Sequence, residues 1–95
     1  MEPLRFVGTP ARAMALLQAT LKTFPEATVV RSEAQSVEVT FKTPVGFEDQ
    51  VDFQIDHQLL RIDFRSRSLI GLIDFGKNRS RMQEFTARFA KQPLL

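Results

Sequence analysis

The chain has 95 residues, of which 43% are hydrophobic and 25% are charged, and its formal net charge is +2. This length and composition are typical of one globular domain. Because the chain contains no cysteine, disulfides, thiolate nucleophiles and zinc–cysteine sites are excluded. No apolar run approaches the ~20 residues that a membrane-spanning helix needs, and Met1-Glu2-Pro3-Leu4 lacks the basic and apolar segments of a secretory signal. We therefore expect a single cytoplasmic domain over residues 1–95.

The charges are distributed unevenly along the chain. Residues 61–95 contain eight Lys or Arg and three Asp or Glu, a net charge of +5, whereas residues 1–60 contain five and eight, a net charge of −3. Such a polarity favours an anion-attracting surface near the C-terminal third without making the whole chain a polycation.

An N-terminal helix is predicted over residues 10–23, after a short arm or strand in residues 1–9. Thr9 is a suitable N-cap, and the proline that follows it is preorganised for the first helical turn. Met14, Leu17, Leu21 and Phe24 recur at spacings of three and four, which predicts one apolar stripe along this helix.

The hydrophobic period then changes to two, which predicts strands over residues 27–32, 36–42, 51–56 and 60–65. Val37, Val39 and Phe41 alternate with polar residues, and the same alternation continues through Leu60 in the last strand. Residues 43–49 contain proline and glycine and are predicted to form a loop, and residues 56–58 a tight turn. Four strands with short connections predict an antiparallel sheet that has one apolar and one charged face.

A second helix is predicted from residue 77 or 78 to residue 90, with Met82, Phe85 and Phe89 on its buried side. Glu84 lies four residues before Arg88 and is expected to pair with it. The order α-β-β-β-β-α predicts an α+β two-layer sandwich, in which both helices cover the apolar face of a four-stranded sheet.

Residues 65–81, here called the 65–81 segment, connect the last predicted strand to this helix and are the strongest candidate for a site. A helix N-terminus favours anions, and arginine pairs with carboxylate or phosphate through two hydrogen bonds. The alternative is structural, since Asp74 is also a good N-cap or arginine partner. The candidate ligand-binding residues are Arg65, Ser66, Ser68, Asp74, Asn78, Arg79 and Arg81.

The same segment carries a family resemblance. The residues Arg65-Ser66-x-Ser68, Gly71, Asp74-x-Gly76-x-Asn78-Arg79-x-Arg81 resemble the closing signature of the bacterial and plastid domain-of-unknown-function family 1499. Phe47-x-Asp49-Gln50-Val51-x-Phe53 is similar to a second element of that family. The resemblance extends over residues ~9–90 and implies the family's fold, but the family has no established activity. Three positions depart from its pattern, namely Leu69, Leu72 and Gln50.

Catalysis is the less favoured hypothesis. Asp49 and Asp74 form the only couple of carboxylates that we consider for acid–base chemistry, and pairing of both with arginines is the simpler expectation. A metal site is not expected, because the chain has one histidine and no cysteine and its acids alternate outward on strands. No cofactor is expected either.

Nucleic acid is not an expected partner, because most phenylalanines occupy predicted core positions instead of interleaving with the basic residues. The apolar residues Leu69, Ile70, Leu72 and Ile73 are expected to extend the core under the sheet edge. If exposed, they would form a patch suited to a protein partner, peripheral membrane contact or a homo-oligomer. The favoured hypothesis is a non-catalytic module that binds a protein or a small anion through the 65–81 segment. The alternatives are a small enzyme that uses Asp49 and Asp74, and a structural subunit of a larger assembly.

Overall fold

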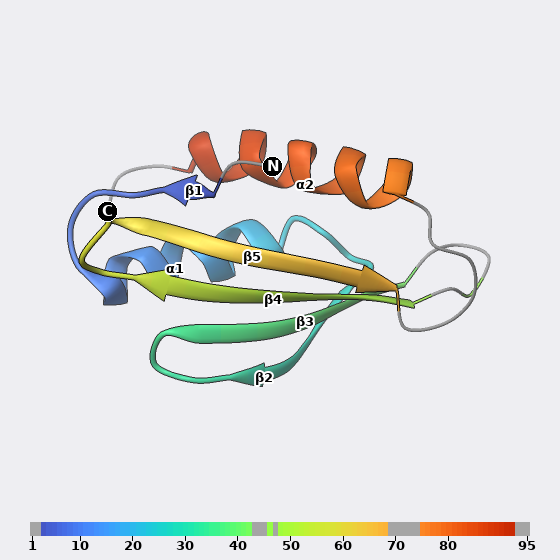
Figure 1. The fold of residues 1–95 in the computed structure, drawn as a ribbon, viewed down its shortest axis with the longest axis horizontal. Coiled ribbons are helices and arrows are strands. Elements are labelled where there is room, and N and C mark those ends of the chain that lie inside the picture. The colour runs from blue at the N-terminus through green and yellow to red at the C-terminus, as the bar shows by residue number, and fades with distance from the viewer. Residues whose placement is uncertain (1–2, 43–45, 47, 69–74, 93–95) are drawn as a thin grey trace.

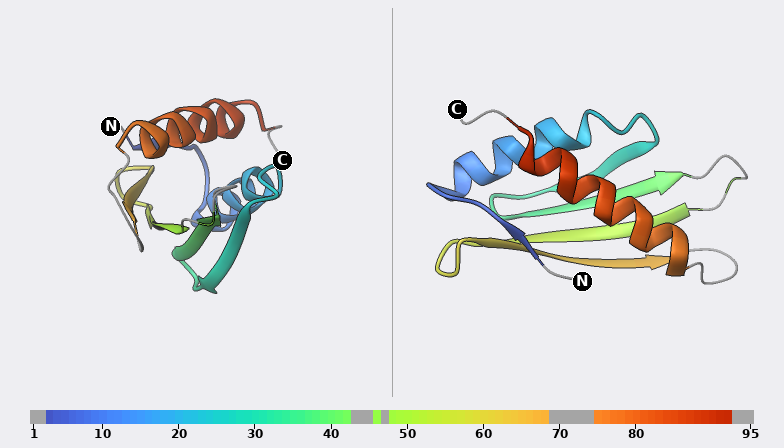
Figure 2. Two further views of the ribbon diagram at one scale, coloured as in Figure 1. Left: turned by 90° about the vertical axis from the view of Figure 1, so that its right-hand side faces the viewer. Right: turned by 90° about the horizontal axis from the view of Figure 1, so that it is seen from above.

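The structure is a computed structural model that describes the backbone of residues 3–42, 46, 48–68 and 75–92, and the side chains of these residues except 67, 68 and 75–79. Its elements are β1 (Leu4–Arg5), α1 (Pro10–Leu21), β2 (Ala27–Ser32), β3 (Ser36–Lys42), β4 (Glu48–Asp56), β5 (Arg61–Ser68) and α2 (Phe75–Ala90). The strands form one antiparallel sheet in the order β1-β5-β4-β3-β2 (Figure 1). Both helices lie on the same side of the sheet, which curves around them (Figure 2). The α+β class with a helix near each end is therefore confirmed.

The first helix begins where the sequence predicts and ends two residues earlier. The Thr9 side-chain oxygen accepts a hydrogen bond from the Arg12 backbone N–H at 3.2 Å, and Pro10 occupies the first turn. This cap satisfies one of the amides that a helix start leaves without an intrahelical partner. Neither helix in the described part of the chain is long and apolar enough to cross a membrane.

The core lies between the helices and the concave face of the sheet. Its centre is a group of phenylalanines from four elements or their ends: the Phe85 ring lies 5.1 Å from Phe53 and 5.5 Å from Phe24, and Phe24 lies 5.9 Å from Phe41. Aromatic pairs at these centroid distances contribute about 0.5–1.5 kcal/mol beyond the burial of their area. The predicted buried side of α2 is confirmed, since Met82, Phe85 and Phe89 are all buried. The core is therefore built from the periodic apolar residues of the sequence.

The edge of the sheet and the turn between β4 and β5 differ from the prediction. The N-terminal arm adds a fifth strand, because Leu4 and Arg5 pair with Ile62 and Arg61 of β5. Leu60 does not continue the alternation of β5 into the core. It lies in the β4–β5 turn with a φ of 51° and is 40% exposed. The turn covers residues 57–60, whereas a turn over residues 56–58 was predicted. The Asp56 carboxylate accepts hydrogen bonds from the backbone N–H groups of Gln58 and Leu59 within it.

Candidate functional site

The 65–81 segment is less of a loop than the sequence predicts. Strand β5 runs through Ser68 and helix α2 already begins at Phe75, so the two ends of the segment belong to regular structure. Asp74 lies outside the described residues, as do the side chains of Ser68, Asn78 and Arg79. Of the predicted ligand-binding residues, Arg65, Ser66 and Arg81 have side chains that the structure describes. These three side chains lie on different surfaces.

Arg81 forms a buried ion pair with Asp49. The Arg81 Nη2 atom lies 3.1 Å from the Asp49 Oδ2 atom, and the two side chains are only 12% and 8% exposed. The guanidinium also lies over the ring of Phe41, 4.8 Å from its centroid. Strand β4 begins at Glu48 instead of residue 51, and the register of Asp49 with Phe41 and Ser68 turns the carboxylate toward the helices. The prediction of a loop over residues 43–49 is therefore wrong for Asp49, which lies in β4 with its carboxylate on the concave side of the sheet.

A second arginine, Arg88, attaches the same helix to the end of α1. Its Nη1 atom donates hydrogen bonds to the Thr23 backbone oxygen at 2.8 Å and to the Thr23 hydroxyl at 3.2 Å. Its guanidinium stacks over Phe24 at 4.2 Å, and its Nε atom lies 2.9 Å from Glu84, which confirms the predicted pair. Positions seven residues apart lie on one side of a helix. Arg81 therefore fastens α2 through its ion pair with Asp49 and the Phe41 ring, and Arg88 through its hydrogen bonds to Thr23 and the Phe24 ring.

Arg65 and Ser66 point to opposite sides of β5. Arg65 faces Asp52 in the register and is exposed on the convex face of the sheet, which no described helix covers. Ser66 faces Val51 and lies half-buried on the concave face. Of the described candidates, Arg65 is the one that a partner in solution can reach, whereas Arg81 is engaged inside the fold.

A polar contact on the convex face involves residues that the sequence did not single out as a cluster. Glu38 and Asp52 face each other across β3 and β4, which is an unfavourable arrangement for two carboxylates. The Gln50 amide nitrogen donates a hydrogen bond to Glu38 and a second one, at 3.0 Å, to Asp52. One amide NH₂ group carries two donors, so Gln50 holds both carboxylates at once. An alternating pattern places all three residues on one face, but the register that brings them together cannot be read from it.

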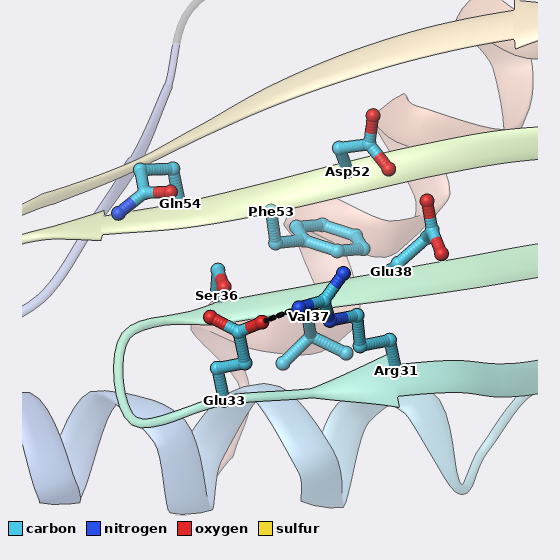
Figure 3. Close-up of a pocket in the computed structure, with 8 residues that line it drawn as sticks. All are labelled: Arg31, Glu33, Ser36, Val37, Glu38, Asp52, Phe53 and Gln54. Carbon is cyan, nitrogen blue, oxygen red and sulfur yellow. Dashed lines mark ion pairs between the residues drawn. The ribbon is translucent and has the colours of Figure 1, made fainter.

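A shallow hollow of about 230 Å³ lies beside these carboxylates (Figure 3). The Arg31 guanidinium pairs with Glu33 at 2.6 Å on its rim, and both side chains are more than half exposed. The hollow is lined by Arg31, Glu33, Ser36, Val37, Glu38, Asp52, Phe53 and Gln54. The hollow lies on the side of the β2–β3 hairpin, where the sequence analysis placed no candidate.

These features define a class of protein: a small α+β domain with one face sealed by two helices and a charged, open convex face. A family model described as "Protein of unknown function (DUF1499)" matches residues 1–89, and the chain belongs to this family. The resemblance expected from the sequence is thereby confirmed over nearly the whole chain. Searches of curated proteins and of solved structures find no significant match.

Proposed function

We propose that this domain is a non-catalytic interaction module that binds an anionic group of a small molecule or protein through the 65–81 segment. The observation that carries the proposal is the buried pair of Asp49 and Arg81. This pair favours a structural role for Asp49, which is the candidate acid–base residue within the described part of the chain. The pair also anchors the first half of α2 at the start of β4, where Asp49 faces Ser68 at the end of β5.

Arg65 supports the binding part of the proposal. It is exposed on the open face, and it makes no ion pair within the part of the chain that the structure describes. An exposed guanidinium offers forked hydrogen-bond donors to carboxylate or phosphate. Ser68, Asp74, Asn78 and Arg79 complete the proposed site, while Ser66 and Arg81 lie on the concave side of the sheet and are not part of its open face.

The enzymatic alternative finds less support. A general base must come within hydrogen-bond reach of a substrate proton, whereas the Asp49 side chain is only 8% exposed and its carboxylate pairs with Arg81. A structural subunit of a larger assembly stays a prediction, as do peripheral membrane contact and the cytoplasmic location.

The test is a titration of the isotope-labelled chain, followed by backbone amide shifts in NMR spectra. The probes are inorganic phosphate, acetate and a hexaglutamate peptide. We expect saturable shifts of the residue 65–68 amides with at least one probe, and at least a tenfold weaker response in Arg65→Gln and Arg79→Gln. Arg31→Gln is the matched control, because Arg31 is also an exposed arginine of the sheet but lies at its other edge. Absence of saturable shifts with all three probes, or equal losses in the control, would overturn the proposal.

A further inference from the structure

Strand β2 is an edge of the sheet, and no strand within the described residues pairs with its outer side. The strand order ends with β2, whereas the opposite edge carries the short β1 (Figure 1). Every residue of β2 after Ala27 is exposed, and Val29 and Val30 are 47% and 59% exposed. An edge strand presents backbone N–H and C=O groups that a further strand can pair with. Exposed valines on such an edge add apolar surface to this template.

An apolar groove follows this edge on the side of the helices. It has a volume of about 470 Å³ and lies between the end of α1 and β2. It is lined by Gln18, Leu21, Lys22, Phe24, Pro25, Ala27 and Val29. A strand added to β2 therefore gains contact with apolar side chains as well as with the backbone.

We infer that the occupant of this edge is β2 of a second copy of the chain, paired antiparallel about a two-fold axis at Thr28. Residues that face each other in an antiparallel pair share one face of the sheet, so a self-pairing must match inward with inward residues. Thr28 faces Thr28 of the second copy in this register. Ala27 then faces Val29, and both lie on the concave face, because their β3 partners are Phe41 and Val39.

A bulge in β2 makes the ends of this pairing complementary in charge. The register with β3 skips Val30, so that Val29 faces Val39 while Arg31 faces Glu38. In the proposed dimer, Val29 and the extra residue Val30 of one copy both stand opposite Ala27 of the other. The next residues to face each other are then Arg31 of one copy and Glu26 of the other. The two-fold axis repeats this pair, so the interface contains two Glu–Arg contacts of opposite charge.

The same features limit the assembly to two copies. Pairing uses one edge of each copy, which makes the interface isologous and closed. Pro25 lacks a backbone N–H and ends the pairing on one side, while the bulge ends its regular part on the other. The intrachain pair of Arg31 with Glu33 is exposed, so exchange of Glu33 for Glu26 of the second copy costs little. The inference is independent of the proposed anion site, because β2 and the 65–81 segment lie at different strands.

The test is disulfide cross-linking between two copies. Because the chain contains no cysteine, a single introduced cysteine can only pair with the same position of a second copy. Directly opposed residues of antiparallel strands have Cα atoms about 4.5–5.5 Å apart, which lies within the ~4.4–6.8 Å range of disulfides. We expect Thr28→Cys to form a disulfide-linked dimer at least tenfold faster under mild oxidation than the control Ser32→Cys. Ser32 is also exposed on β2, but it does not face its own copy in this register. Equal rates would overturn the inference.

Charge reversal in the Thr28→Cys chain tests the register separately. Glu26→Arg and Arg31→Glu should each slow cross-linking severalfold, because like charges then meet at both ends of the pairing. The chain with both substitutions should recover most of the original rate, since the opposite charges face each other again. Both residues are exposed, so circular dichroism should report an unchanged fold. A double variant that is as slow as the single variants would refute this register.

Discussion

Removal of the Arg81 guanidinium by Arg81→Met is expected to destabilise the fold more than removal of any other single charge among the described side chains. The Asp49 side chain is 8% exposed and would lose its ion pair with Arg81, and the contact of Arg81 with the Phe41 ring would be lost as well. Loss of one partner of a buried pair costs about 3–5 kcal/mol. The total stability expected for a chain of 95 residues is about 5–14 kcal/mol. The midpoint of thermal unfolding should fall by more than 10 °C, at about 4–8 °C per kcal/mol.

The same reasoning predicts that the loss is not additive. Asp49→Val leaves Arg81 without this partner, but the long arginine side chain can turn its head toward water, so we expect a smaller loss of about 2–3 kcal/mol. The double variant, Asp49→Val with Arg81→Met, replaces both charged side chains with apolar ones. Valine suits a strand and methionine suits a helix. Such replacements are often neutral or stabilising, so the double variant should lie within about 1 kcal/mol of the native chain.

Urea unfolding of the full chain, followed by circular dichroism, measures this cycle. The matched control is the exposed pair of Arg31 and Glu33, whose N–O distance of 2.6 Å is shorter than the 3.1 Å of the buried pair. Its coupling should nevertheless stay below about 1 kcal/mol, because exposure to water screens it. Additive losses at Asp49 and Arg81, or a coupling no larger than that of the control, would refute the argument that burial decides the strength of the pair.

Two further changes test the polar contacts of the sheet and the helix. Gln50→Glu replaces the amide that bridges Glu38 and Asp52 with a third carboxylate. Urea unfolding at low salt should show a loss of about 2 kcal/mol in stability, and 1 M NaCl should recover part of this loss. A loss that does not depend on salt would contradict this reasoning. Arg88→Ala should cost about 1–2 kcal/mol by removing the hydrogen bonds to Thr23, and Arg88→Lys should restore little of it, because lysine lacks the planar fork; full rescue by lysine would show that charge alone matters.

Much of the fold could be predicted from local patterns. The cap at Thr9 and the period of about 3.6 residues place α1, and the period of two places the central strands β3 and β4. These signals depend on neighbouring residues only, so they survive without knowledge of the tertiary structure. The pairing of Leu4 with Ile62 joins residues 58 positions apart. Two residues carry no periodic signal, and β1 could therefore be expected only as an arm or a short strand.

The candidate site was harder to predict, because long-range geometry decides its contacts. The sequence predicted that Asp49 either pairs with an arginine or acts in catalysis, but it did not identify Arg81 as that arginine and gave Arg81 a ligand-binding role. Their pairing depends on the start of β4 at Glu48, which turns Asp49 toward the concave face. Leu60 was misplaced for a related reason. Its apolar side chain fits the alternation of β5, but the turn that joins β4 to β5 extends through it.

The buried pair also decides which arginine can test the proposed binding function. A substitution at Arg81 removes a contact that holds α2 to the sheet, so a loss of binding in that variant would not separate recognition from stability. Arg65 lies on the convex face, where its removal leaves the helices and the core in place. Surface substitutions of this kind usually change stability by less than about 0.5 kcal/mol. Loss of anion binding in Arg65→Gln at unchanged stability is therefore the result that attributes recognition to the exposed face.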